Sequence, residues 1–128
     1  MPLAEVIKVA EFRAALRQFL RRTEKTAATH GLTPQRYLLL LMIKGAPDGS
    51  QTSTVTTLSA QMHLAQHTVT ELVARAERVG LIRRKVNPND RRIVHLTLTP
   101  KGDRLLGASF AELEADRNAL RKLIARLG

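Results

Sequence analysis

The most basic stretch of this 128-residue chain lies between residues 81 and 98 and holds five cations against one acid. The cations flank Asn87-Pro88-Asn89-Asp90, a combination of residues typical of a tight turn. Arginine binds phosphate through a planar fork, and the negative potential of a narrow minor groove attracts it. We therefore expect contacts to nucleic acid: minor-groove contacts from Arg91 and Arg92, backbone contacts from Arg84 and Lys85, and an ion pair between Asp90 and an arginine that holds the tip. The alternative for Arg91 and Arg92 is a solvated loop without a ligand.

The charge balance of the whole chain also favours nucleic acid. Lysine and arginine total 21 against 11 acidic residues, a formal net charge of +10, which attracts polyanions. A membrane surface is the rival partner, but the longest apolar run, Leu38–Ile43, is far shorter than the ~20 residues of a spanning helix. An aromatic content of 3% argues against a base-stacking platform for single strands. Double-stranded DNA is therefore the expected partner, and no membrane association is expected.

A second group of candidate residues begins a predicted helix over 66–79. It follows a shorter predicted helix over 55–62 and a break at 63–65, and this order indicates a helix-turn-helix. Side chains at the start of the second helix reach base edges or nearby phosphates, and here they are Gln66, His67, Thr68 and Thr70. Thr68 has an alternative role in capping or packing the helix start. Arg75 is expected to clamp a phosphate or to form an ion pair within the domain, and Thr54 to offer its hydroxyl and backbone N–H to phosphate.

The remaining elements predict a mainly α (α+β) fold in one domain, residues 1–128. Apolar spacing predicts a helix over 3–29, and Thr33-Pro34 starts a buried helix that runs to Ile43. Alternation predicts strands over 81–86 and 93–98. Thr99-Pro100 starts a final helix to about Leu127, with a bend in its polar stretch 115–118 as an option. Its expected buried stripe is Leu106, Phe110, Leu113, Leu120, Leu123, Ile124 and Leu127.

Four segments of this chain carry a resemblance to a known family. The segments are Gly31-Leu32-Thr33-Pro34-Gln35-Arg36-Tyr37, Thr68-Val69-Thr70-Glu71-Leu72-Val73-Ala74-Arg75, Gly80-Leu81-Ile82-Arg83-Arg84 with Asn87-Pro88-Asn89-Asp90-Arg91-Arg92, and Leu96-Thr97-Leu98-Thr99-Pro100-Lys101-Gly102. In this order they resemble the multiple antibiotic resistance regulator (MarR) family of winged-helix repressors, over roughly residues 31–105. The Asn-Pro-Asn-Asp-Arg-Arg wing is the most specific of these signals.

The resemblance implies an architecture and a function. Residues 1–30 and 101–128 would be dimerisation helices that interlock in an obligate homodimer, and residues 31–100 the winged helix-turn-helix. Two recognition helices ~34 Å apart would read a palindromic operator, because protein symmetry is mirrored in the half-sites. The function implied is that of a ligand-responsive transcriptional repressor, whose effector, not named by any sequence feature, would bind between the DNA-binding region and the dimerisation helices. The alternative is a winged helix used for protein interaction or nonspecific DNA packaging.

Two positions and the length of the last segment depart from the family pattern. Glu71 stands where a basic residue is common, so Glu71 and Glu77 offset Arg75 and Arg78 and the recognition helix carries no net charge. The wing is then expected to supply most of the electrostatic affinity. His63 stands where glycine is common in the turn, and the segment from Lys101 onward is shorter than usual, which predicts a smaller or rearranged dimer interface.

Other chemistry and locations find little support in the sequence. His63 and His67 are four residues apart, but the predicted break separates them and no cysteine or carboxylate cluster completes a metal site. No nucleophile–base motif, glycine-rich phosphate loop or paired-acid motif is present, so we expect neither an enzyme nor a cofactor. The N-terminal segment carries Glu5 and Glu11 and no small-residue cleavage site, which predicts a cytoplasmic protein without a signal peptide.

Overall fold

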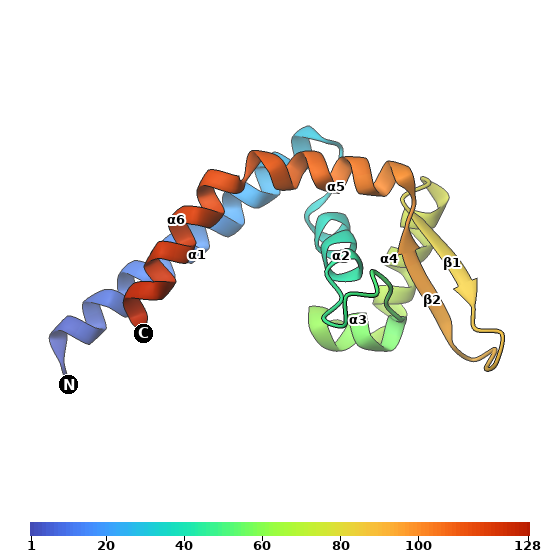
Figure 1. Cartoon of the computed structure of the whole chain (residues 1–128), viewed down its shortest axis with the longest axis horizontal. Coiled ribbons are helices and arrows are strands. Elements are labelled where there is room, and N and C mark those ends of the chain that lie inside the picture. Colours follow the sequence, from blue (N-terminus) through green and yellow to red (C-terminus); the bar gives the residue numbers. More distant parts are fainter.

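The computed structural model describes all residues, 1–128, and confirms the mainly α class with a small two-stranded sheet. Figure 1 shows two parts: a long arm formed by the first and last helices, and a body that carries the remaining elements. In chain order the elements are α1 (Leu3–Thr29), α2 (Pro34–Lys44), α3 (Val55–Met62), α4 (Gln66–Arg78), β1 (Ile82–Val86), β2 (Val94–Leu98), α5 (Pro100–Glu112) and α6 (Glu114–Leu127).

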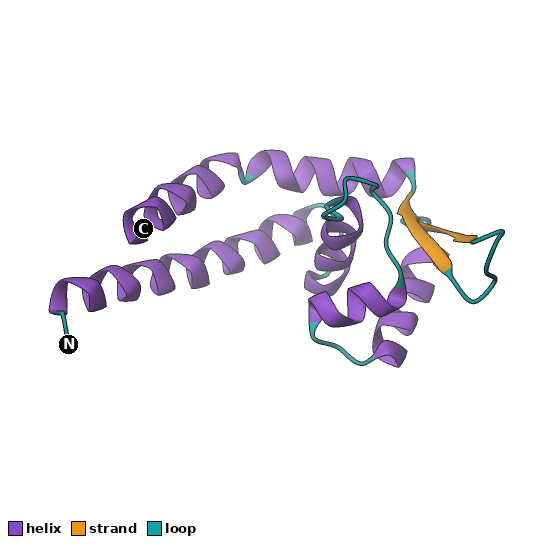
Figure 2. Cartoon of the chain, turned by 60° about the horizontal axis from the view of Figure 1, so that its bottom comes forward, coloured by secondary structure: helices purple, strands orange, loops and turns teal.

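The arm consists of α1 and α6, which lie side by side in both views (Figures 1 and 2). An ion pair between Arg22 and Asp116, 2.7 Å apart, ties them together near the body. Further out their apolar side chains stay exposed, and α6 has no buried residue at all. No helix of the structure combines the length and apolarity needed to cross a membrane.

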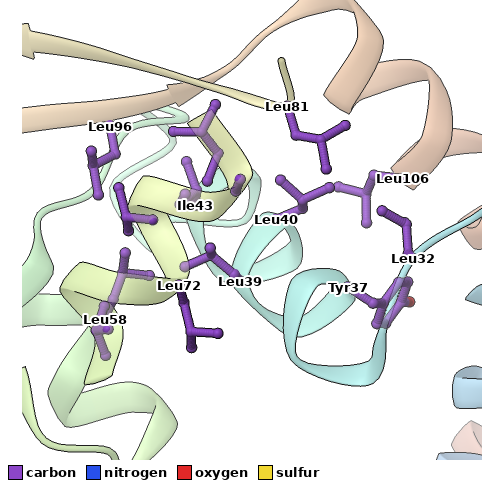
Figure 3. Packing of buried hydrophobic residues seen from close by; sticks show 14 of the residues in the cluster. Leu32, Tyr37, Leu39, Leu40, Ile43, Leu58, Leu72, Leu81, Leu96 and Leu106 are labelled. Carbon is purple, nitrogen blue, oxygen red and sulfur yellow. The ribbon is translucent and has the colours of Figure 1, made fainter. Parts of the chain in front are cut away.

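Helix α2 is the centre of the hydrophobic core. Thr33 caps it by accepting a hydrogen bond from the Arg36 N–H at 3.2 Å, and Pro34 occupies its first turn, as predicted. Leu39, Leu40 and Ile43 are completely buried, and Figure 3 shows neighbouring elements contributing side chains around them. Each fully buried side chain of this kind contributes about 1.5–3 kcal/mol by leaving water, so α2 anchors the body.

The two strands pair antiparallel, from Ile82 opposite Leu98 to Val86 opposite Val94. Each strand begins one residue later than predicted, at Ile82 and Val94. Gly80 adopts a left-handed conformation with φ of 78°, and the Leu81 N–H bonds back to the Ala76 carbonyl at 2.9 Å. Leu81 therefore belongs to the end of α4 instead of the strand. A single bridge from Ser53 to Leu96 adds a short extended segment that precedes α3.

The start of α5 is docked on the turn that precedes β1. Thr99 caps the helix, accepting from the Gly102 N–H at 3.1 Å, and its own N–H donates to the Leu81 carbonyl at 3.0 Å. A Cβ placed on Gly102 would lie 2.3 Å from that carbonyl oxygen, so only glycine fits here. The junction fixes the direction in which the chain leaves the hairpin toward the arm.

The bend in the last helix lies earlier than predicted. The chain breaks at Leu113, between α5 and α6, and not within the polar stretch 115–118. Leu113 is 2% exposed, and the break directs α6 along α1, where Asp116 meets Arg22. The predicted buried stripe is correct at Leu106 and Leu113 but wrong for the isolated chain at Phe110, Ile124 and Leu127, which are 36–50% exposed.

Candidate nucleic-acid interface

The turn between α3 and α4 depends on an unusual backbone conformation at His63. Its φ of 54° and ψ of 43° are left-handed, which glycine adopts without strain and other residues seldom do. The next residue, Leu64, donates its N–H to the Ser59 carbonyl at 3.2 Å and so ends α3. This geometry explains why glycine suits position 63, and it sets the angle at which α4 follows α3.

Helix α4 has one buried face and one exposed face. Val69, Leu72, Val73 and Ala76 pack into the core. Of the predicted contact residues, Gln66, His67, Thr70 and Arg75 are exposed and Thr68 is half-buried. The N-cap position is Ala65, which makes no side-chain cap, so the alternative that Thr68 caps the helix is wrong. The exposed face is available to a groove, as a recognition helix requires.

Contacts within the protein bear on the predicted roles of Thr70 and Arg75. The Thr70 hydroxyl donates to the Gln66 carbonyl at 2.9 Å, so its oxygen can only accept from a further partner. Arg75 forms none of the ion pairs of the chain, so the intradomain ion pair considered for it is absent. Its contact with a phosphate stays a prediction.

Thr54 is the N-cap of α3. Its hydroxyl oxygen accepts from the Thr57 N–H at 3.3 Å, and the same hydroxyl lies 3.2 Å from the Thr57 hydroxyl. The side chain is therefore engaged in the cap. What the start of α3 still offers to an anion is the backbone N–H groups of Val55 and Thr56.

The tip of the hairpin is ordered by its own side chains. The Asn87 carbonyl oxygen Oδ1 accepts from the backbone N–H groups of Asn89 at 2.8 Å and Asp90 at 3.3 Å. The Asp90 carboxylate in turn accepts three hydrogen bonds from Arg92, which donates its backbone N–H, Nε and Nη2 at 3.0–3.1 Å. This contact lowers the pKa of Asp90 and raises the pKa of Arg92. The guanidinium is held at the tip although its side chain is 90% exposed.

The two residues predicted to contact the DNA backbone, Arg84 and Lys85, lie on different faces of the hairpin. Arg84 pairs with Leu96 across the sheet and Lys85 pairs with His95, so their side chains lie on opposite faces. Arg84 lies on the face toward α4, where its guanidinium is 3.8 Å from the Glu77 carboxylate. Arg83 shares the face of Lys85, and both are exposed. DNA contacts from Arg84 and from Lys85 would therefore come from opposite faces of the hairpin.

The structure adds two exposed residues to α4 that the predicted site lacked. Counting about 100° per residue, the side opposite the four buried residues is occupied by His67, Glu71 and Arg78. Neither residue was among the predicted contacts, although the sequence already indicates that Glu71 lies away from the apolar stripe and that its carboxylate could accept from cytosine N4. The spacing of the apolar residues already contains this information, because the direction opposite a buried stripe follows from helix geometry.

A sequence profile decides the family. The profile of the MarR family matches residues 30–93, half of the 128-residue chain. The chain belongs to the MarR family. Two curated relatives are transcriptional regulators by name: the HTH-type regulator YsmB of Bacillus subtilis (strain 168) is 32% identical over 60% of this chain, and a Thauera aromatica regulatory protein for the hcr operon is 36% identical over 70%. The chain spans about half the length of these relatives, 50% and 49%.

Solved structures share the fold. The transcriptional regulator Tm0710 of Thermotoga maritima is 28% identical, with a TM-score of 0.65 over 91% of this chain and 77% of its own. An E. coli MarR variant complexed with operator DNA is 20% identical, with a TM-score of 0.68 over 100% of this chain and 84% of its own. CouR of Rhodococcus jostii RHA1, bound to p-coumaroyl-CoA, is 24% identical, with a TM-score of 0.66 over 80% of this chain and 69% of its own.

This MarR-family chain also has an apolar pocket where the arm meets the body. Its volume is about 270 Å³, and it is lined by Phe19, Leu20, Thr23, Glu24, Pro34, Tyr37, Leu38, Leu41, Phe110, Leu113 and Arg117. The Arg117 guanidinium lies 3.5 Å from the centre of the Phe110 ring, and burial raises the pKa of Tyr37. A mainly apolar cavity whose polar side chains are one cation (Arg117), one carboxylate (Glu24) and the hydroxyls of Thr23 and Tyr37 has the composition of a small-ligand site. No group of three or more His, Asp or Glu side chains is placed to hold a metal ion.

Proposed function

We propose that this protein is a sequence-specific, double-stranded DNA-binding transcriptional regulator that acts as a homodimer on a palindromic operator. The observation that carries the proposal is the exposed polar face of α4 next to an ordered basic hairpin, both on one body. The helix suits a major groove and the hairpin tip a minor groove. The names of the two curated relatives and of the DNA-bound neighbour support the same function.

The arm supports the dimeric state. Large apolar side chains remain exposed along α1 and α6, among them Leu3 at 72%, Ile7 at 50% and Ile124 at 50%. An apolar surface of this kind on two packed helices is typical of an interface. A second copy of the same arm covers it symmetrically, which makes residues 1–30 and 101–128 the dimerisation helices and residues 31–100 the DNA-binding region.

Selection of binding sites from a random duplex pool, at low and at moderate salt, tests this function. We expect enrichment of a palindrome with half-site centres about 10 base pairs apart, because two recognition helices enter successive major grooves. Retention of all DNA without enrichment, fading steeply with salt, would mean attraction to the backbone alone. That result would replace the regulator with the alternative function, nonspecific DNA packaging.

We further propose that the regulator is a ligand-responsive repressor and that its effector occupies the apolar pocket. The pocket takes walls from α1, α2 and the α5–α6 bend, so an occupant touches both the arm and the body. A ligand that prefers one angle between these parts shifts the population toward that angle and changes the spacing of the two recognition helices. Arg117 and Tyr37 favour an apolar acid, with its carboxylate on the guanidinium and its ring against Phe110.

Benzoate and benzamide form a matched pair of probes for this pocket. Benzoate should raise the Tm of the wild type and release the selected operator, whereas benzamide, with the same ring and no charge, should have a smaller effect. In Arg117→Gln the difference between the two probes should disappear, because the cation that distinguishes them is gone. An equal benzoate shift in the wild type and in Arg117→Gln would place the acid elsewhere. Circular dichroism of the variant checks that its fold is retained.

A further inference from the structure

Glu71 lies on the exposed face of α4, about 30° from the direction directly opposite the buried residues. The buried residues of the helix, Val69, Leu72, Val73 and Ala76, all lie on the opposite side. A helix that enters a major groove with its buried face toward the body presents this side to the base edges. Glu71 lies one turn after His67, within the first half of the helix, where side chains reach the bases most directly.

The Glu71 carboxylate has no partner within the protein. It takes part in none of the ion pairs of the chain, whereas Glu77, the other acid of α4, lies 3.8 Å from Arg84. Arg75, one turn further along, does not reach it either. A free carboxylate that moves between two phosphate strands loses hydration and meets like charge. Binding therefore requires a hydrogen-bond donor on the DNA to offset this cost.

The four bases differ in what they offer a carboxylate in the major groove. Guanine presents two acceptors, N7 and O6, and thymine presents the O4 acceptor, so both repel it. Adenine offers the N6 amino group, but its N7 acceptor lies beside it. Cytosine offers the N4 amino group with no acceptor next to it on the same base. Cytosine is thus the base that a carboxylate at this position accepts best.

On these grounds we propose that Glu71 is a specificity-determining residue that demands a cytosine at one position of each operator half-site. The inference rests on the proposed function, because it needs α4 to lie in a major groove. It also gives a role to a recognition helix without net charge: the helix rejects sequences that lack the amino donor, while the basic hairpin supplies attraction that does not depend on sequence.

Binding-site selection with four proteins tests the inference: the wild type, Glu71→Gln, Glu71→Ala and the control Glu77→Gln. The wild type should enrich one invariant cytosine in each half-site. Glu71→Gln should move that preference to adenine, because glutamine binds adenine N6 and N7 together, and Glu71→Ala should lose the preference at that position alone. Glu77→Gln removes the same charge from the same helix and should keep the cytosine.

Affinities for two duplexes that differ only at the cytosine pair measure how strongly Glu71 discriminates between bases. Replacing the cytosine pair should weaken wild-type binding about tenfold and Glu71→Ala binding less than about twofold. If Glu71→Gln and Glu71→Ala both select the half-site of the wild type, Glu71 reads no base. That result overturns the inference and leaves the proposed function as a DNA-binding regulator unaffected. If the wild type enriches no palindrome, the proposed function is overturned first, and the inference with it. Thermal unfolding of each variant confirms that this exposed position leaves the fold intact.

Discussion

Replacing Gly102 by alanine is expected to destabilise the protein by about 2–4 kcal/mol, because the junction between the hairpin and α5 leaves no room for a methyl group. The added Cβ would lie 2.3 Å from the Leu81 carbonyl oxygen. That oxygen belongs to backbone and already accepts the Thr99 N–H, so it cannot move aside as a side chain could. Thermal unfolding at fixed protein concentration should show a Tm lower by roughly 10 °C.

Gly107 supplies the matched control, because it lies in the same helix and a Cβ there meets nothing within 4 Å. Gly107→Ala should stabilise the protein by about 0.5–1 kcal/mol through the better helix propensity of alanine. Opposite signs for two identical substitutions five residues apart would identify the close approach to Leu81 as the cause. A Tm of Gly102→Ala equal to that of the wild type would show that the junction relaxes without cost.

The elements that the sequence predicted well are those set by local chemistry. Thr33-Pro34 and Thr99-Pro100 begin α2 and α5 at the expected residues, because a hydroxyl cap followed by proline is a local signal. The turn between the strands follows in the same way from Asn87 and Asp90, whose side chains bond the neighbouring backbone.

Features that depend on distant contacts were missed or misplaced. The break at Leu113 buries that leucine and brings Asp116 to Arg22, which is 94 residues away in the chain, so the polar stretch 115–118 pointed to the wrong position. The pocket unites Phe19, Tyr37 and Arg117 from three helices, and no local pattern marks Arg117 as part of it.

The apolar positions of the arm show a different limit. Their spacing predicts burial, but Ile124 and Leu127 are exposed in the single chain. Apolar periodicity predicts that one face of a helix is buried, but it does not indicate whether the same chain or a second copy buries it. Helix α4 differs in this respect, because its apolar spacing already places Glu71 on the outward face, and the fold adds Arg78 to that face.

Removing both arginines at the wing tip is expected to weaken binding to every DNA sequence alike. Arg91 and Arg92 are exposed and carry four charges in a dimer, and each contact with the phosphate-lined groove releases counterions. For Arg91→Ala combined with Arg92→Ala, the slope of log K against log salt should decrease by about three to four, and affinity near physiological salt should fall about 100-fold or more. Titration of the selected operator and of an unrelated duplex over a salt series measures both quantities.

The arm provides the control for this wing variant. Arg17→Ala combined with Arg21→Ala removes the same number of exposed charges from α1, away from the hairpin, and should leave the slope nearly unchanged. Asp90→Asn provides a second control, in which the expected change in affinity is opposite to the one that net charge alone would give. It makes the protein more positive, yet it should weaken binding because Arg92 loses the carboxylate that holds it at the tip. Equal slopes for the wing and arm variants would mean that overall charge, and not the position of the wing, provides the attraction. Tighter binding by Asp90→Asn would mean that Asp90 holds Arg92 away from the DNA.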